Sequence, residues 1–153
     1  MITAKAETVK KESSAPTHSD IESLLGLRTK GLPGLLGQVK VGLSYTSLEN
    51  FVRKTHFPRE EAVNLVRISP RTLARRKEQG RFSPEESDRL VRAARIVSQT
   101  LSLFEGNADA AHHWLKTSQP ALGGATPIEY AQTEIGAREV EALITRLEHG
   151  VFS

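Results

Sequence analysis

The chain contains no cysteine, few aromatic residues and no long apolar run, and each of these absences narrows the class of protein. Without cysteine there is no disulfide framework, thiol nucleophile or cysteine-ligated zinc site, and the composition suits a reducing cytoplasm, where we expect the protein. No apolar segment approaches the roughly 18 residues of a membrane span, so we expect no membrane partner. Aromatic residues make up only 5% of 153 residues, which favours a helical core packed from leucine, valine and alanine.

The formal net charge of +3 hides an uneven distribution along the chain. Residues 1–66 carry nine basic and seven acidic side chains, residues 67–99 carry nine and four, and residues 100–153 carry three and seven. A basic segment attracts phosphate groups, whereas an acidic one repels them. The pattern indicates two surfaces with different partners, although two ordinary solvated faces would give the same counts.

The first part of the chain offers weak structural signals. Residues 1–18 mix lysine and glutamate without an apolar centre, which is typical of a disordered tail and not of a secretory signal. Ser19 and Glu22 form a candidate capping box for a short helix that ends at Gly26. Residues 31–37, rich in glycine and leucine, lack the ending of a phosphate-binding loop and predict a turn or a packing segment. Ser47 is the candidate N-cap of the next helix.

Prolines and capping residues then predict a regular series of helices. Four X-Pro dipeptides place proline where a first helical turn accepts it, which predicts helices over about 58–66, 70–79, 84–105 and 127–134. Asn107 predicts a further helix that ends near Pro120, and the last helix is expected from Ala137 to about His149. Because no segment alternates polar and apolar residues with period two, the predicted fold class is all-α.

The helix predicted over 84–105 has a core side and a basic side. Glu86 completes a capping box with Ser83. Its apolar stripe is Leu90, Ala94, Val97, Leu101 and Phe104. The other side carries Arg89, Arg92, Arg95 and Gln99, and we expect it to form an exposed basic face.

Residues 58–79 have the pattern of a helix-turn-helix, in which the second helix enters the major groove of DNA. Ala62, Val66 and Ile68 are expected to be buried, and Leu73 faces inward on the second helix. The candidate DNA-binding residues are Ser69, Arg71, Thr72, Arg75, Arg76 and Gln79. Arginine suits this role because its planar fork bonds to guanine and its fixed charge neutralises phosphates.

Two residues depart from the commonest helix-turn-helix pattern. Arg67 occupies the turn position where glycine is frequent, and Arg76 stands where an apolar residue is common. A solvated basic helix without a DNA partner therefore stays an alternative.

The remaining polar residues form no recognisable catalytic or metal-binding motif. His112 and His113 are adjacent, so on a helix they point about 100° apart, and we expect no metal site. Trp114 is expected in the core, with a partner-facing role as the alternative. The sequence shows no Ser/His/Asp order and no motif with paired carboxylates. We therefore predict that the protein is not an enzyme and binds no cofactor, and a small helical enzyme is the third alternative.

Seven short motifs, in order along the chain, together resemble the Xre-type antitoxins of RES–Xre toxin–antitoxin pairs, which carry a C-terminal Xre/MbcA/ParS toxin-binding domain. The motifs lie at 69–76, 86–90, 114–115, 122–127, 133–137, 140–141 and 146–153, and the resemblance covers about residues 45–153. It implies an antitoxin that binds a cognate NAD⁺-degrading RES-domain toxin and occludes its active site. It also implies a homodimer that represses its own operon by binding operator DNA.

On this resemblance we expect a helix-turn-helix domain over 47–105 and a toxin-binding domain over 106–153, preceded by a packing segment over 19–46. Gly123 and Gly124 are expected to form a tight turn before a helix capped by Thr126. The hypothesised toxin contacts are Arg146, Glu148, His149, Gly150, Val151, Phe152 and Ser153. Phe152 would be the apolar anchor, unless the tail folds back onto the core. The alternative function is a free-standing dimeric helix-turn-helix regulator without a toxin partner.

Overall fold

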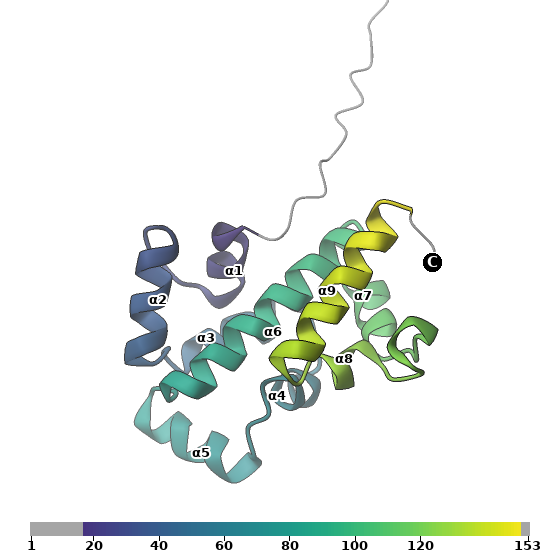
Figure 1. Ribbon diagram of the computed structural model, residues 1–153. Helices are drawn as coiled ribbons and strands as arrows, with labels where there is room; N and C mark the ends of the chain where they lie inside the picture. Colours follow the sequence, from purple (N-terminus) through teal and green to yellow (C-terminus); the bar gives the residue numbers. More distant parts are fainter. Residues whose placement is uncertain (1–16, 151–153) are drawn as a thin grey trace, which may run out of the picture.

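The computed structural model describes residues 17–150, whose regular secondary structure is helical (Figure 1). Its elements are α1 His18–Leu25, α2 Gly31–Val41, α3 Thr46–Thr55, α4 Arg59–Val66, α5 Pro70–Gln79, α6 Pro84–Leu103, α7 Ala108–Leu115, the short 3₁₀ helix η1 Pro120–Leu122, α8 Pro127–Tyr130 and α9 Glu134–Glu148. The described residues form no strand, and an isolated bridge joins Ser44 to Arg81. The predicted all-α class is confirmed.

Helix α6 is the centre of the fold and runs diagonally through the molecule (Figure 1). Its start is the predicted capping box: the Ser83 hydroxyl accepts a hydrogen bond from the Glu86 amide at 3.1 Å, and the Glu86 carboxylate accepts one from the Ser83 amide at 2.8 Å. The helix packs against α1, α2, α3, α4, α7 and α9. Of the expected stripe, Leu101 and Phe104 are only half-buried.

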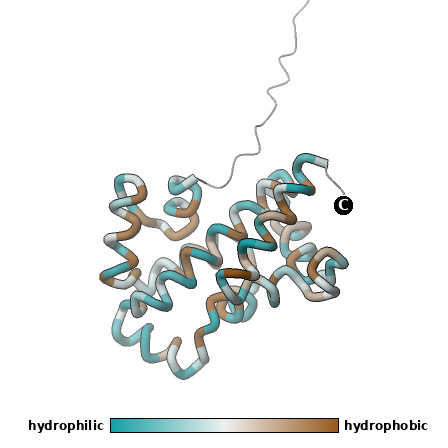
Figure 2. The backbone as a smooth tube through the Cα atoms, in the orientation of Figure 1, coloured by the Kyte–Doolittle hydropathy of each residue, from teal (hydrophilic) through white to brown (hydrophobic). Residues whose placement is uncertain are grey.

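One hydrophobic core extends through the described chain. It runs from Ile21 in α1 through Phe51 in α3 and Ile96 in α6 to Ile144 in α9. Figure 2 shows the hydrophobic stretches spread over helices of both halves. The N-terminal and C-terminal parts therefore stabilise each other through shared burial of apolar surface.

Helix α1 begins earlier than expected. Thr17 and Asp20 form the capping box, with the Asp20 carboxylate accepting from the Thr17 amide at 2.9 Å, so the prediction of a Ser19–Glu22 box was wrong. The expected tail is therefore too long by two residues, and its remainder, 1–16, lies outside the described residues. The Thr-x-x-Asp spacing makes the same reciprocal bonds two residues upstream. Gly26 ends the helix in the left-handed region, as expected.

Tertiary packing also overrides two other local expectations near the N-terminus. Residues 31–37 belong to α2, so the turn alternative was wrong, whereas the burial of Leu35 agrees with the packing alternative. This burial outweighs the low helix propensity of glycine. Ser47 is not an N-cap: α3 begins at Thr46, and Ser47 lies buried in its first turn.

The C-terminal helices have different limits from those expected. Helix α8 ends at Tyr130 and not near residue 134, because Thr133 caps α9 by accepting a hydrogen bond from the Gly136 amide at 3.0 Å. Helix α9 therefore begins at Glu134, three residues before the expected start. Helix α7 is capped by Asn107, as predicted, but ends at Leu115, well before Pro120.

Candidate DNA-binding and partner-binding surfaces

Helices α4 and α5 form the helix-turn-helix, joined by residues 67–69. Ala62, Val66 and Ile68 are buried, as the pattern predicted. Arg67 adopts a left-handed conformation with φ 59° and ψ 50°. The turn thus has the backbone geometry that glycine normally supplies at this position, and an arginine adopts it at a conformational cost.

Helix α5 projects from the rest of the molecule (Figure 1). Ser69 caps it by accepting a hydrogen bond from the Thr72 amide at 3.2 Å, and none of its own residues is fully buried. Leu73 is the residue that packs partly against the core. Arg71 and Arg75 are exposed on the opposite side, about 160° around the helix from Leu73 in either direction. The two arginines are therefore free to approach a polyanion.

Arg76, included in the predicted DNA-binding set, is used inside the protein. Its Nε lies 2.6 Å from Oε1 of Glu86 and its Nη2 lies 3.2 Å from Oε2, while Nη1 donates to Gln79 at 2.8 Å. Burial alone raises the pKa of Glu86, but the hydrogen bonds from Arg76 and Ser83 outweigh it, so this pKa lies below its usual value. The hydrogen bond to Glu86 likewise raises the pKa of Arg76.

This ion pair explains the departure of Arg76 from the usual apolar residue. A bidentate contact with Glu86 replaces the apolar contact between the second helix and its successor. We therefore remove Arg76 from the candidate DNA-contacting residues, and Gln79 is partly engaged by it.

Glu78 is a surface residue that the sequence reasoning missed. It is exposed and lies about 140° from Leu73, on the same side as Arg71 and Arg75. The same 100° step per residue places it on this side from the sequence alone. A glutamate carboxylate can accept a hydrogen bond from the cytosine amino group in the major groove.

The prediction of an exposed basic face on α6 was wrong for Arg92, Arg95 and Gln99. Nε of Arg92 lies 2.7 Å from Oε2 of Glu134, and Nε of Arg95 lies 2.5 Å from Oε1 of Glu141. Gln99 also faces α9, with Nε2 donating to the Thr145 hydroxyl at 3.3 Å. These residues form the polar part of the α6–α9 contact and do not face a phosphate backbone.

The carboxylate of Glu134 is the centre of this contact. Burial raises its pKa, but the hydrogen bond from Arg92 and the charge of Arg95 outweigh it, so the pKa of Glu134 lies below its usual value. Part of the positive charge of residues 67–99 is thus neutralised by the acidic C-terminal segment.

The end of α9 reaches the surface far from α5, at the opposite end of the molecule (Figure 1). Arg146 and Glu148 are half-buried, and His149 and Gly150 are exposed. The His149 amide donates to the Thr145 carbonyl at 3.1 Å and closes the helix. The other hypothesised toxin contacts, Val151, Phe152 and Ser153, lie outside the described residues.

The turn before α8 has the predicted form. Gly123 and Gly124 have φ values of 66° and 88°, and Thr126 makes a full capping box with Glu129. Trp114 is half-buried, with its ring centroid 6.3 Å from that of Phe104. This packing supports the expected core role.

The two adjacent histidines have separate surroundings. His112 pairs with Glu61 of α4, which also pairs with Lys116, whereas His113 is exposed. Within residues 17–150, no group of three or more potential metal ligands gathers. No helix of these residues has the length and apolarity needed to cross a bilayer.

Comparison with known proteins identifies two domain families along the chain. Residues 34–95 match the antitoxin Xre-like helix-turn-helix domain, and residues 99–150 match the antitoxin Xre/MbcA/ParS C-terminal toxin-binding domain. Antitoxin Xre of Yersinia enterocolitica is 38% identical over 132 residues, which cover 82% of this chain and 89% of the relative.

Two further relatives are similar over most of their length. Antitoxin Xre of Photorhabdus laumondii is 32% identical over 144 residues, covering 90% of this chain and 97% of the relative. A Sphingobium protein named Prs ADP-ribosylating antitoxin is 24% identical over 127 residues, covering 77% and 80%. The chain therefore belongs to the Xre antitoxin family. It is an antitoxin of a toxin–antitoxin system, with a helix-turn-helix domain for DNA and a C-terminal domain for a toxin.

Proposed function

We propose that this antitoxin neutralises a RES-domain toxin that degrades NAD⁺, by binding it and covering its active site. The protein itself performs no catalysis and works in the cytoplasm. The observation that carries the proposal is the separation of α5, with its exposed arginines, from the free end of α9 (Figure 1). Two partners can then bind one chain at different places.

The toxin contact is assigned to the end of α9 and the residues that follow. Arg146, Glu148, His149 and Gly150 lead into a short segment that contains Phe152, an aromatic residue of the kind that anchors interfaces. The name of the Sphingobium relative supports NAD⁺ as the toxin substrate, since ADP-ribosylation takes its ADP-ribose group from NAD⁺.

We further propose that the protein represses its own operon as a homodimer. Ser69, Arg71, Thr72 and Arg75 contact operator DNA, with Gln79 at the edge of this surface. A single α5 offers a small contact surface, and two half-sites about 34 Å apart require two recognition helices.

The toxin proposal is tested by purifying the antitoxin with the product of its neighbouring gene and measuring NAD⁺ turnover. We expect the toxin alone to consume NAD⁺, and the toxin–antitoxin complex to consume little. The antitoxin alone should consume none. Deletion of residues 150–153 should restore toxicity in a co-expression growth assay. Full neutralisation by the truncated protein would refute the role of the tail.

The operon proposal is tested by a gel-shift assay with promoter DNA. Replacement of Arg71 and Arg75 by alanine should abolish the shift while the helical circular dichroism stays unchanged. Unchanged affinity would refute the assigned DNA surface.

A further inference from the structure

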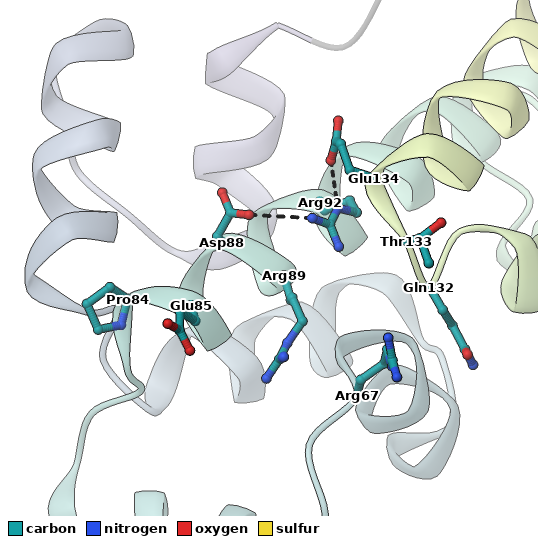
Figure 3. Close-up of a pocket in the computed structure, with 9 residues that line it drawn as sticks. All are labelled: Arg67, Pro84, Glu85, Asp88, Arg89, Arg92, Gln132, Thr133 and Glu134. Carbon is teal, nitrogen blue, oxygen red and sulfur yellow. Dashed lines mark hydrogen bonds and ion pairs between the residues drawn. The ribbon is translucent and has the colours of Figure 1, made fainter.

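A shallow, solvent-open depression of about 620 Å³, here called the cavity, lies where the helix-turn-helix meets the toxin-binding domain (Figure 3). Arg67 comes from the turn before α5, Arg89 from α6, and residues 132–134 from the segment that begins α9. Residues of both matched domains thus line one space.

Arg67 and Arg89 differ from the neighbouring arginines in having no acidic partner. Arg76 and Arg92 form ion pairs with glutamates, whereas neither Arg67 nor Arg89 forms one with any residue of the described range 17–150. Nε of Arg89 is buried, and no acceptor within these residues bonds to it. A desolvated guanidinium N–H without an acceptor is unfavourable. Because protein atoms cover Nε itself, an anion in the cavity would bind Arg89 through its terminal nitrogens.

Each of the two side chains can bind a carboxylate from its own side of the cavity. In Figure 3 the side chain of Arg89 extends downward from α6, and that of Arg67 stands at the end of α4 with its guanidinium group apart from that of Arg89. A single guanidinium group binds a carboxylate through paired hydrogen bonds, so either arginine offers donors for both oxygens.

We propose that this cavity binds a carboxylate side chain of the cognate toxin. The proposal rests on the proposed toxin partner and adds a second contact, far from the end of α9. Residues 132–134 belong to the segment that matches the toxin-binding domain. Ile135, which follows them, is 81% exposed and offers the toxin an apolar contact beside the cavity.

A DNA phosphate fits the same cavity less well. Glu85 and Asp88 also line it, and the Asp88 side chain is 66% exposed. A polyanion would bring several phosphates close to these carboxylates, whereas a protein partner can present one acidic side chain between them.

The test measures toxin affinity, at a fixed near-physiological salt concentration, for the full-length antitoxin and single variants. Arg89→Gln and Arg67→Gln remove the positive charge but keep a polar side chain. Arg28→Gln is the matched control, because Arg28 is exposed in the α1–α2 connection and does not line the cavity. We expect each cavity variant to weaken toxin binding about tenfold or more, and the control less than about twofold.

Two further measurements separate the site from a folding defect or a DNA role. Thermal unfolding followed by circular dichroism identifies the folded variants. Hydrogen exchange on the wild-type complex should show slower exchange of amides 67–69 and 132–135 than in the free antitoxin. The affinity of Arg89→Gln for a promoter duplex should match the wild type.

The outcomes are distinct. Unchanged toxin affinity of both variants, or unchanged exchange at these amides, overturns the site while the proposed function stands. Lost DNA affinity with unchanged toxin affinity would show that the cavity binds a DNA phosphate and not the toxin. A wild-type protein that does not bind the toxin overturns the proposed function and the site together.

Discussion

The guanidinium of Arg76 in α5 and the carboxylate of Glu86 in α6 form an ion pair with two hydrogen bonds, of 2.6 Å and 3.2 Å. The Glu86 side chain is only 7% exposed, and the same carboxylate also caps α6 through the Ser83 amide. Helix α5 packs little against the other helices, so this pair is a main determinant of its orientation. A polar contact thus positions the candidate DNA-binding helix.

Substitutions of the three arginines of α5 should separate structural from DNA-contacting roles. Arg76→Gln should lower the melting temperature, because Glu86 then lacks its charged partner. Arg71→Gln and Arg75→Gln should leave melting unchanged, since both residues are exposed.

The salt dependence of DNA binding tests the DNA-contacting role of Arg71 and Arg75. Each of Arg71→Gln and Arg75→Gln should reduce the slope of log affinity against log salt by about 0.9, the value for one phosphate contact. A reduced slope for Arg76→Gln at unchanged stability would contradict the assignment.

Acid should destabilise the protein through Glu86 and Glu134. Both carboxyls have a folded-state pKa below the reference value of 4.5. Between the two pKa values the unfolded state binds more protons than the folded state. The contribution of each carboxylate to the free energy of unfolding is therefore complete above the pKa of the unfolded chain. It is lost as the pH falls through the lower pKa of the folded state. Urea unfolding midpoints should fall between pH 5 and pH 3. Glu134→Gln should make this fall shallower, and an identical pH profile for the variant would refute the linkage.

Two helical glycines should respond in opposite ways to alanine. At Gly136 an added Cβ would lie 1.7 Å from the Tyr130 carbonyl oxygen, so Gly136→Ala should force α8 and α9 apart and cost about 1–3 kcal/mol. At Gly37 no atom lies within 4 Å of the added Cβ, so Gly37→Ala should stabilise α2 by roughly 0.5–1 kcal/mol. Chemical denaturation of both variants tests the pair, and equal shifts would show that the close approach at Gly136 is unimportant.

Arg67→Gly should raise stability and weaken toxin binding at the same time. The positive φ of 59° is unfavourable for arginine, and glycine should relieve it by roughly 0.5–1 kcal/mol after the greater freedom of the unfolded glycine is counted. The substitution also removes one of the two cations from the cavity. A higher urea midpoint together with lower toxin affinity is expected, whereas a lower midpoint would indicate a structural contact of the arginine side chain.

The positions of several helices followed from local sequence. Ser69-Pro70, Ser83-Pro84 and Thr126-Pro127 each begin a helix where predicted, because a capping hydroxyl and a proline act on backbone groups within one turn. The helix-turn-helix and the inward side of Leu73 followed from helical periodicity. The family motifs could likewise be identified in the sequence, since they occur in order along the chain.

The roles of the arginines depended on the folded arrangement. Arg92 and Arg95 looked like an exposed basic face, but their partners Glu134 and Glu141 lie 42 and 46 residues later in the chain. Nothing in the local sequence predicts that Arg67 and Arg89 line the same cavity. Capping and periodicity are properties of neighbouring residues and can be predicted from sequence. Charge pairing between α6 and α9 depends on which helix faces are buried together, and packing of the whole core determines that.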